Sequence, residues 1–496
     1  MATVIPRWEW RAFARRFPRA EDRFAETAGT EPEESEELYF LSGGSGNVKV
    51  RDDLMDVKVL RETDPADLER WEPVLKEGFP LTAASVERIF EALEVPAPRF
   101  SRDAYTLGQL VAEVIEPMGE VRAVGVRKRR TRYQLSGCMG EMTDVAIGDR
   151  STRTIAIESE DPSAVIEAVR RFGLEGYVNT SYPKGLQALI DDEPERYAVI
   201  DIGTNSVKFV IAKVDEGGGR PVVDRAEVTR LGQGRDADGR IADEPLERTT
   251  AAIVGMVEEA RRDRTRAILA VGTAAIRNAA NRDEVVAAIR SHAGIGVEVL
   301  SGEEESRLGF LAVTAGLGVT QGSLVVFDTG GGSTEFTFGQ DGQIDERFSL
   351  NVGAASYTDR FGLDAAMEPD MLRRAREAIA GDLGRIDGRP TPDTLVGMGG
   401  AVTNMVAVQR SMGTYDPDAV QGTTLERSEV ERQIELYRSR NDEERRSITG
   451  LQPNRASVIL AGACIVSSVM EKLQKDSLTV SDRGVRHGLL TERFGA

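Results

Sequence analysis

The second half of the chain contains one short unit twice, and this repeat constrains the fold more than any other feature. The unit is an apolar strand, an aspartate, a turn of small residues and a second strand. It runs first from YAVIDIG through GTNS to KFVIAKV, and again from SLVVFDTGGGST to TEFTFG. Alanine-rich helical runs lie between and after the copies, which indicates an α/β fold with an internal duplication. The predicted helical runs are Glu247–Arg262, Asp283–His292, Asp370–Arg385 and Asn454–Leu473.

Both turns of the repeat carry residue types that bind phosphate. Backbone N–H groups in such a turn form a concave anion site, and glycine lets the backbone approach an anion closely. An aspartate before each turn, Asp201 or Asp328, can hold a divalent cation against the same phosphate. A single turn of this kind could be an ordinary tight hairpin, but two matched turns can hold one phosphate chain from both sides. The candidate phosphate-binding residues are Gly203, Thr204, Asn205, Ser206, Gly330, Gly331, Gly332, Ser333 and Thr334.

Two further motifs lie beside the repeat. Ser301–Arg307 reads SGEEESR and brings three carboxylates next to an arginine. It could be an exposed helix N-terminus, where the helix dipole favours acids, or it could supply a carboxylate that activates water. Gly397–Asn404 reads GMGGAVTN between a strand and a helical run. A helix beginning there would offer free N–H groups to a phosphate near Gly399 and Gly400.

Taken together, these motifs resemble the exopolyphosphatase/guanosine-pentaphosphatase family, Ppx/GppA. The matching stretches occur in the family's order and cover residues 196–496. They are AVIDIGTNSVKFVIA, AVGTAAIRNAANRDE, VEVLSGEEESRLGF, VVFDTGGGSTEF, VGMGGAVTN, ASVILAGACI and VSDRGVRHGLL. The resemblance implies the two-lobed actin-like ATPase fold (a duplicated ribonuclease H-like fold), with lobes at 196–322 and 323–496 and the active site in the cleft between them.

The resemblance also implies roles for individual residues. Glu305 corresponds to the catalytic base, although Ser306 follows it where the family has alanine. Glu335 corresponds to a second acidic helper, and Arg277 to an arginine that contacts phosphate. Asp201 and Asp328 are expected to bind Mg²⁺, with Mn²⁺ as an alternative. Lys208, in the first hairpin, is a further candidate for a phosphate contact.

Residues 1–190 have a different texture, with short stretches in which charged and apolar residues alternate. In RWEWR the charged residues share one face of a strand and the tryptophans the other, and NVKVR, VRKRRTRY and TIAIESE behave similarly. Such strands are half-buried and antiparallel. Their charged faces could simply contact water, or they could line a closed barrel that holds a polyanion and a metal ion. The candidate polyanion-binding residues are Lys49, Arg51, Lys128, Arg130, Arg132, Glu158 and Glu160.

This segment resembles the CYTH (triphosphate tunnel) fold, an antiparallel β-barrel of the α+β class. SYPKGL at Ser181–Leu186 is similar to the family's closing Ser-Tyr element, and Glu158 and Glu160 to its late metal-binding pair. The family's N-terminal Glu-x-Glu-x-Lys reads Arg7-Trp-Glu9-Trp-Arg11 here. Because this change removes a metal carboxylate and adds positive charge, we expect residues 1–190 to bind polyphosphate rather than to cleave it. We also expect an acidic loop at Gly29–Glu37 and a linker at Asp191–Arg196.

Composition narrows the functional class. The net charge of -19 argues against nucleic-acid binding, and two histidines exclude a histidine-rich metal site. Two distant cysteines and the absence of a long apolar run favour a cytoplasmic protein without a membrane partner. We expect an Mg²⁺-dependent exopolyphosphatase that releases orthophosphate from chain ends. The alternatives are a guanosine pentaphosphate phosphohydrolase, a non-catalytic polyphosphate or alarmone sensor, and a kinase of the same superfold; a homodimer is an open option.

Overall fold

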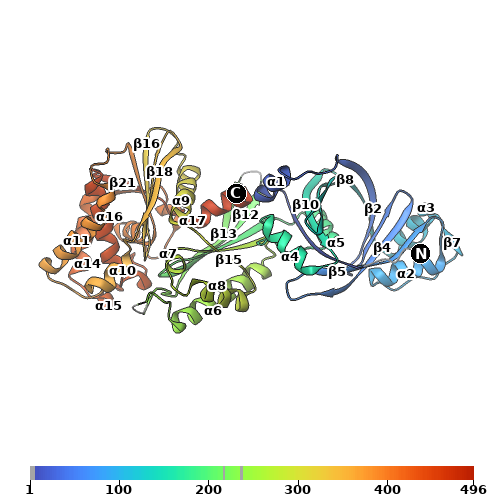
Figure 1. Cartoon of the computed structure of the whole chain (residues 1–496), viewed down its shortest axis with the longest axis horizontal. Helices are drawn as coiled ribbons and strands as arrows, with labels where there is room; N and C mark the ends of the chain where they lie inside the picture. Colours follow the sequence, from blue (N-terminus) through green and yellow to red (C-terminus); the bar gives the residue numbers. More distant parts are fainter. Residues whose placement is uncertain (1–5, 216–217, 235–237, 496) are drawn as a thin grey trace.

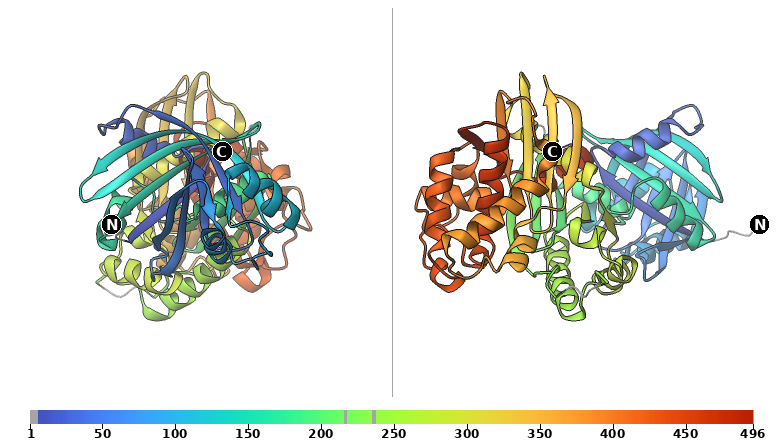
Figure 2. Two further views of the ribbon diagram at one scale, coloured as in Figure 1. Left: turned by 90° about the vertical axis from the view of Figure 1, so that its right-hand side faces the viewer. Right: turned by 60° about the vertical axis from the view of Figure 1, so that its left-hand side comes forward.

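The structure, a computed structural model, describes residues 6–215, 218–234 and 238–495. Three bodies follow one another along its longest axis: the N-terminal barrel, a middle α/β lobe and a C-terminal α/β lobe (Figure 1). The second view of Figure 2 shows the same succession from another side. No helix within the described ranges is both long and apolar enough to cross a membrane.

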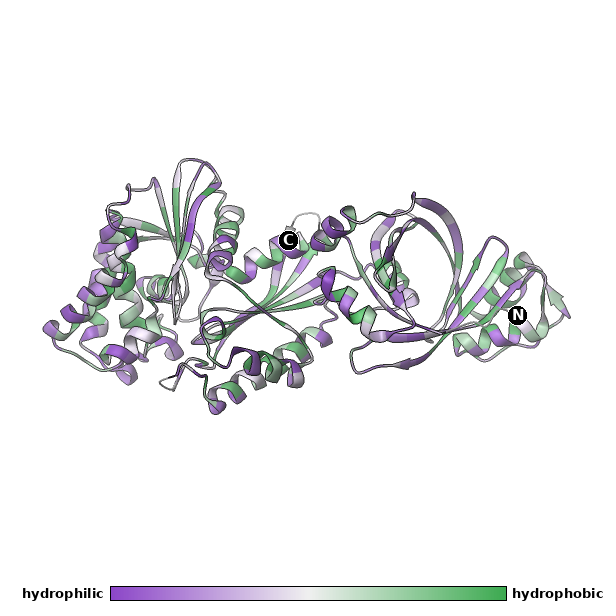
Figure 3. Cartoon of the chain, in the orientation of Figure 1, coloured by the Kyte–Doolittle hydropathy of each residue, from purple (hydrophilic) through white to green (hydrophobic). Residues whose placement is uncertain are grey.

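Within residues 6–159, all of which the structure describes, eight strands close into the expected antiparallel barrel. Their spatial order is β1-β10-β9-β8-β2-β3-β4-β5. Figure 3 shows hydrophilic and hydrophobic residues alternating along these strands, which is the pattern of a barrel with two different faces. The strands are β1 (Arg7–Ala14), β2 (Glu33–Leu41), β3 (Asn47–Arg51), β4 (Leu54–Thr63), β5 (Glu69–Gly78), β8 (Arg122–Leu135), β9 (Cys138–Ile147) and β10 (Arg150–Ser159).

One expectation for this segment is wrong. Gly29–Glu37 does not form an acidic loop, because Glu33–Glu37 belong to β2 and pair with β8. Basic residues of β8 lie opposite three of these acids in the register, with Glu33 beside Arg130, Glu34 beside Arg129 and Glu36 beside Arg127. Charge complementarity between the two strands therefore stabilises a strand where the acidic composition alone suggests a loop.

Short helices surround and close the barrel. Residues 81–118 cover the outside of β3, β4 and β5 with a core of their own, which includes Phe90 and Tyr105. The helix α5 (Tyr182–Ile190) packs its Tyr182 and Leu186 against the inward residues Phe13 and Tyr39. The other elements here are α1 (Pro18–Ala25), β6 (Leu81–Thr82), α2 (Ala83–Leu93), β7 (Ala104–Tyr105), α3 (Leu107–Gln109), η1 (Leu110–Ile115), η2 (Glu116–Met118) and α4 (Pro162–Arg171).

The two lobes each contain a sheet of the same design. In the order β13-β12-β11-β14-β15, a hairpin meander is followed by strands parallel to β11. The order β18-β17-β16-β19-β21-β20 repeats this arrangement, with β16 in the place of β11. The predicted duplication is therefore present in three dimensions. The strands are β11 (Glu195–Ile202), β12 (Ser206–Asp215), β13 (Gly218–Val228), β14 (Ala267–Gly272), β15 (Val297–Val299), β16 (Ser323–Thr329), β17 (Thr334–Gln340), β18 (Gln343–Leu350), β19 (Thr394–Met398), β20 (Thr424–Glu426) and β21 (Ser477–Val480).

The predicted helical runs are present, although one begins later than expected. Residues 453–455 form a short 3₁₀ turn, η4 (Pro453–Arg455), and the long helix α16 (Ile459–Lys472) starts after it. The remaining helices are α6 (Asp243–Arg262), α7 (Ala274–Arg277), α8 (Arg282–Ala293), α9 (Gly302–Leu317), α10 (Ala354–Phe361), α11 (Pro369–Asp382), η3 (Gly384–Ile386), α12 (Gly400–Gln409), α13 (Pro417–Val420), α14 (Arg427–Arg438), α15 (Asp442–Arg445) and α17 (Val485–Phe494).

The last helix, α17, returns from the C-terminal lobe to the middle lobe, where it packs on α9 and β11 (Figure 1). The sequence analysis assigns these residues to the 323–496 lobe. Phe494 stacks on Tyr197 with ring centroids 4.3 Å apart, and one continuous core joins both to Trp10 and Phe24 of the barrel segment. The barrel is thus seated on the middle lobe through shared apolar packing, which α17 completes.

Candidate active site

A pocket between the two lobes collects most of the residues that the motifs predict. Both phosphate turns, both aspartates, Glu305, Glu335 and the Gly399–Gly400 turn line it. The aspartates end the central strands β11 and β16, and each turn leads into the next antiparallel strand. Because the two sheets share one topology, the duplicated turns meet across the cleft.

The two turns approach each other so closely that glycine is required. A Cβ on Gly332 would lie 2.6 Å from the hydroxyl oxygen of Thr204, and one on Gly331 would lie 3.1 Å from the Cβ of Asn205. Backbone N–H groups of one turn therefore face the side chains of the other without a side chain of their own between them. This geometry fits a site that grips an anion from two sides.

A third turn completes the phosphate-binding surface. Gly399 has a φ of +95°, and a Cβ there would meet the carbonyl oxygen of Thr329 at 2.4 Å. The helix α12 begins at the next residue, Gly400, as the sequence predicts. The free N–H groups at its N-terminus lie at the pocket wall and add positive potential there.

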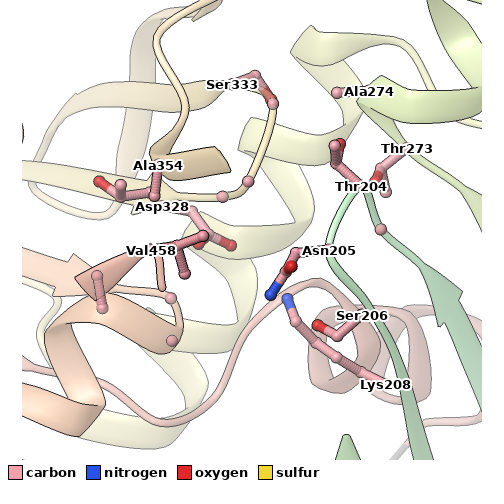
Figure 4. A pocket seen from close by; sticks show the side chains of 18 of the residues that line it. Thr204, Asn205, Ser206, Lys208, Thr273, Ala274, Asp328, Ser333, Ala354 and Val458 are labelled. Carbon is pink, nitrogen blue, oxygen red and sulfur yellow. The ribbon is translucent and has the colours of Figure 1, made fainter. Parts of the chain in front are cut away.

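Asp201 and Asp328 lie at the base of the pocket with Lys208 close by. The Nζ atom of Lys208 is 3.4 Å from Oδ2 of Asp201. Burial opposes the charge of Lys208, but Asp201 and Asp328 outweigh it and raise the pKa of this amine. Figure 4 shows Lys208 and Asn205 extending from the first hairpin toward the side of the cleft that carries Asp328.

The donor set at the pocket base fits a hydrated divalent cation. Across the described residues, no group of three or more Asp, Glu, His or Cys side chains is placed to enclose a metal ion. Mg²⁺, however, is usually held by one or two carboxylates, with water and substrate phosphate completing its shell. Burial raises the pKa of Asp328, and nearby Asp201 raises it further against the attraction of Lys208. A cation at this point would relieve that repulsion.

Glu305 is held in the first turn of α9. Ser301 caps this helix by accepting a hydrogen bond from the Glu304 N–H at 3.1 Å, and Glu305 then turns inward while Glu303 stays exposed. The motif therefore forms an exposed, capped helix N-terminus and also places one buried carboxylate at the pocket, whose role in activating water stays a prediction. Burial raises the pKa of Glu305 well above its ordinary range, nearby Glu335 raises it further, and Arg277 opposes both.

Glu335 is the second buried acid of the site. It lies opposite Asp328 in the β16–β17 register and accepts a hydrogen bond from Ser349 at 2.7 Å. Burial, reinforced by Asp328, raises its pKa to about 7. Glu305 and Glu335 thus form a carboxylate pair that retains protons at a pH where exposed carboxylates have lost them, and the two titrate together.

Arg277 and Thr334 differ from their predicted placement among the phosphate-contacting groups. Arg277 does not line the pocket: its Nη1 atom lies 2.7 Å from Glu305, and its Nη2 atom lies 3.8 Å from Glu335. It therefore pairs with both carboxylates instead of lining the pocket. Thr334 is fully buried and donates its hydroxyl to the carbonyl oxygen of Val352.

Arg455 is a pocket residue that the sequence analysis misses. The 3₁₀ turn η4 carries it to the pocket wall, where its Nη2 atom is 3.4 Å from the Ser206 hydroxyl oxygen. Its Nε atom has no hydrogen-bond partner, and among the described residues the ionisable neighbours that act on the pKa of Arg455 are Tyr415 and Arg486, neither of which is a carboxylate. Burial lowers the pKa of this guanidinium. A half-buried cation without a neighbouring carboxylate, beside a phosphate turn, is suited to an anionic ligand. Only a lone arginine in PNRAS marks it in the sequence.

The predicted barrel residues separate into an inner group and an outer group. Lys49, Arg51, Lys128 and Arg130 converge inside the barrel on Glu37, a residue that the sequence analysis does not single out. Arg132 is half-exposed and pairs with Glu33. Glu158 faces inward opposite Glu9, whereas Glu160 lies in an exposed bend after β10. Arg11 of the N-terminal motif also faces inward, and its partner Glu141 is missed by the sequence analysis.

Replacing Glu335 by glutamine is predicted to shift the acid limb of the pH–rate profile. Because the Glu335 charge raises the pKa of Glu305, an uncharged amide lets Glu305 remain ionised at lower pH. Profiles of kcat/KM against pH should show the acid limb of Glu335→Gln at lower pH than that of the wild type. Glu303→Gln, an exposed residue in the same turn of α9 as Glu305, is the matched control. An unmoved limb in Glu335→Gln would contradict the coupling.

Comparison with known proteins identifies the catalytic part. The Ppx/GppA phosphatase family matches residues 210–495. Exopolyphosphatase 2 of Mycobacterium tuberculosis is 30% identical over 317 residues, which cover 60% of this chain and 99% of that protein. Exopolyphosphatase 1 of the same species is 26% identical over 309 residues and covers 60% and 88%. A crystal structure of the Aquifex aeolicus Ppx/GppA family member is 32% identical, with a TM-score of 0.52 and coverage of 60% and 96%.

These matches confirm the two-lobed actin-like ATPase fold, and the closed barrel has the architecture that the CYTH resemblance implies. The residues matched by the family include the second phosphate turn, the helix of Glu305 and the whole C-terminal lobe. The first turn, at Gly203–Ser206, precedes them but faces the second turn across the pocket. Because the family match covers residues 210–495, which is more than half of the sequence, the chain belongs to the Ppx/GppA phosphatase family.

Proposed function

We propose that this chain is an Mg²⁺-dependent exopolyphosphatase, which removes orthophosphate from the end of inorganic polyphosphate. The observation that carries the proposal is the presence of a buried carboxylate, Glu305, in the same pocket as three anion-binding turns. Turns of this kind recognise phosphate, and a buried base beside them selects water as the acceptor. The similarity to two exopolyphosphatases supports the choice of polymer.

The pocket residues divide the chemical work. The backbone N–H groups of the turns, Lys208 and Arg455 surround the terminal phosphates and balance the charge that develops as the bond breaks. Glu305 accepts a proton from the attacking water, and Arg277 fixes the direction of that carboxylate. Asp201 and Asp328 would hold Mg²⁺, which supplies charge neutralisation on the phosphoryl oxygens when it is bound.

The barrel gives this function a second anion site. Its inward cations face a closed interior, which suits a polyanion better than a nucleotide base or an apolar ligand. Because the barrel and the catalytic lobe share a core, a polymer held by the barrel stays near the cleft, and its effective concentration there is raised. This favours inorganic polyphosphate over guanosine pentaphosphate as the substrate.

The proposal is tested by measuring orthophosphate release with Mg²⁺ from long-chain polyphosphate and from guanosine pentaphosphate in parallel. We expect release mainly from the polymer, and Glu305→Gln serves as the inactive reference. Release mainly from guanosine pentaphosphate would contradict the proposed substrate and indicate a role in alarmone metabolism. Binding of either compound without release would favour a sensor.

Replacing Arg455 by methionine should weaken substrate capture. The loss of hydrogen bonds to a charged ligand costs about 1.5–3 kcal/mol, so we expect KM for polyphosphate to rise roughly tenfold to a hundredfold. Arg374→Met, on the exposed surface of α11, is the matched control and should leave KM unchanged. A normal KM in Arg455→Met would remove this guanidinium from the binding site.

A further inference from the structure

Inside the barrel, the carboxylate of Glu37 lies among cations that could otherwise contact an anionic ligand. Glu37 projects inward from β2, and its side chain is completely inaccessible to solvent. Its neighbours in the barrel, β3 and β8, each direct two cations at it. From the nearest atoms of Glu37, the distances are 2.7 Å to Lys128, 3.2 Å to Lys49, 3.6 Å to Arg130 and 3.8 Å to Arg51.

One carboxylate cannot satisfy this many donors. Oε2 of Glu37 accepts hydrogen bonds from Lys49, Lys128 and Tyr39, whereas Oε1 has no hydrogen-bond partner. Nε and Nη2 of Arg130 also lack hydrogen-bond partners, although only 6% of this side chain is exposed and Nη2 is 3.6 Å from Oε1 of Glu37. Buried guanidinium N–H groups without an acceptor are rare in folded proteins. Arg130 is therefore poised for an acceptor that Glu37 does not supply.

The charge balance around Glu37 also favours binding of an anion. Through Glu141 and Arg11 the ion pairs extend to Glu9, and Glu69 and Glu158 lie beside Glu9, so this end of the network is acidic. Around Glu37, in contrast, four cations meet one carboxylate. Burial alone would raise the pKa of Glu37, but Lys49 and Lys128 outweigh it and lower the pKa to about 2. Glu37 thus stays charged, and the four cations around it leave a local positive excess that a ligand with several anionic oxygens can neutralise.

The barrel interior also limits the shape of that ligand. Next to the cluster, the inward side chains become apolar, and α5 fills this end with Tyr182 and Leu186 against Phe13 and Tyr39. The Tyr182 ring contacts the cation cluster directly, because Nζ of Lys128 lies 4.0 Å from the centroid of this ring. Because α5 covers this end, a ligand would have to reach the cations from the other end of the barrel.

We infer that Glu37 is an internal competitor for the anion site of the barrel, so that a ligand binds by replacing this carboxylate among Lys49, Lys128 and Arg130. The inference rests on the proposed role of the barrel in polyanion binding and adds the residue that sets its selectivity. A singly charged anion gains little by displacing a carboxylate that already contacts four cations. A chain of linked phosphates brings more charge and more acceptors than Glu37 does, and so can replace it.

The test compares tripolyphosphate binding, by calorimetry, to full-length protein carrying Glu305→Gln with and without Glu37→Gln. The amide keeps the size of the side chain but removes the competing charge, so we expect the barrel site to bind tripolyphosphate at least about tenfold more tightly. Without ligand, the Tm of Glu37→Gln should fall, and tripolyphosphate should raise it by more than it raises the Tm of the parent. Glu33→Gln, on the same strand but half-exposed, is the matched control and should change neither quantity.

The variant Arg130→Met distinguishes failure of the Glu37 inference from failure of the proposed anion binding by the barrel. If this variant loses one tripolyphosphate site while Glu37→Gln binds no more tightly than the parent, the barrel binds anions but Glu37 does not compete, and the inference is overturned. If Arg130→Met keeps every site at unchanged affinity, the barrel holds no anion, and both ideas fail. Should Glu37→Gln not fold in buffer, refolding with tripolyphosphate is expected to recover it, and failure of that rescue would count against the inference.

Discussion

Replacing Glu305 by glutamine is expected to lower kcat for orthophosphate release from polyphosphate by about 10²–10⁴-fold, the usual contribution of a general base. The amide keeps the volume and the contact with Arg277 but cannot accept the proton of the attacking water. Binding of polyphosphate should remain, because the three turns and Arg455 are unchanged. The measurements are steady-state release and equilibrium binding of the same variant.

The control for this variant is Glu303→Gln, which carries the same change two residues away on an exposed position of α9. It should release orthophosphate at the wild-type rate. Turnover near normal in Glu305→Gln would exclude Glu305 as the base. Loss of binding together with turnover would instead indicate that the substitution disturbs the pocket.

Replacing Arg277 by methionine is predicted to produce the second large effect. Removal of one partner from a buried ion pair typically costs about 3–5 kcal/mol, and here it leaves Glu305 and Glu335 facing each other without their common cation. Because Arg277 lowers the pKa of Glu305, its loss should raise that pKa further and keep the base protonated at neutral pH. Activity should therefore fall at pH 7 by up to about tenfold for each unit of pKa gained.

A merely structural role for Arg277 predicts a different pH profile. If Arg277 acts through Glu305, raising the pH should restore part of the lost activity of Arg277→Met, and Arg277→Lys should lie between the two proteins. A profile parallel to that of the wild type at every pH would contradict this account, because a general loss of folded protein does not depend on the protonation of Glu305.

Much of the fold follows from the sequence because two patterns are strong. The repeated Asp-turn unit places Asp201 and Asp328 at equivalent strand ends, and the structure confirms that arrangement. The alternation of charged and apolar residues in RWEWR and VRKRRTRY predicts half-buried antiparallel strands, and of the two arrangements left open for them the structure has the closed barrel. Both patterns are local, and each is repeated often enough to exclude most other folds.

The features that the sequence analysis misses depend on contacts between distant segments. Glu37 lies in an acidic run that looks like a loop until β8 supplies the opposite charges. Arg455 reaches the pocket only because a 3₁₀ turn precedes α16. The direction in which Arg277 points depends on α9, which carries Glu305 and follows in the sequence. None of these relationships has a periodicity or a spacing that a single sequence reveals.

The central claim, that the chain removes single phosphates from the end of the polymer, is tested most directly by following both products of one reaction. Long-chain polyphosphate is incubated with the full-length protein and Mg²⁺, and released orthophosphate and the length of the remaining chains are measured over time. The account predicts orthophosphate from the first time point, with no fragments of intermediate length from internal cleavage, and no release by Glu305→Gln. Intermediate fragments that appear before orthophosphate, or equal release by Glu305→Gln, would contradict it.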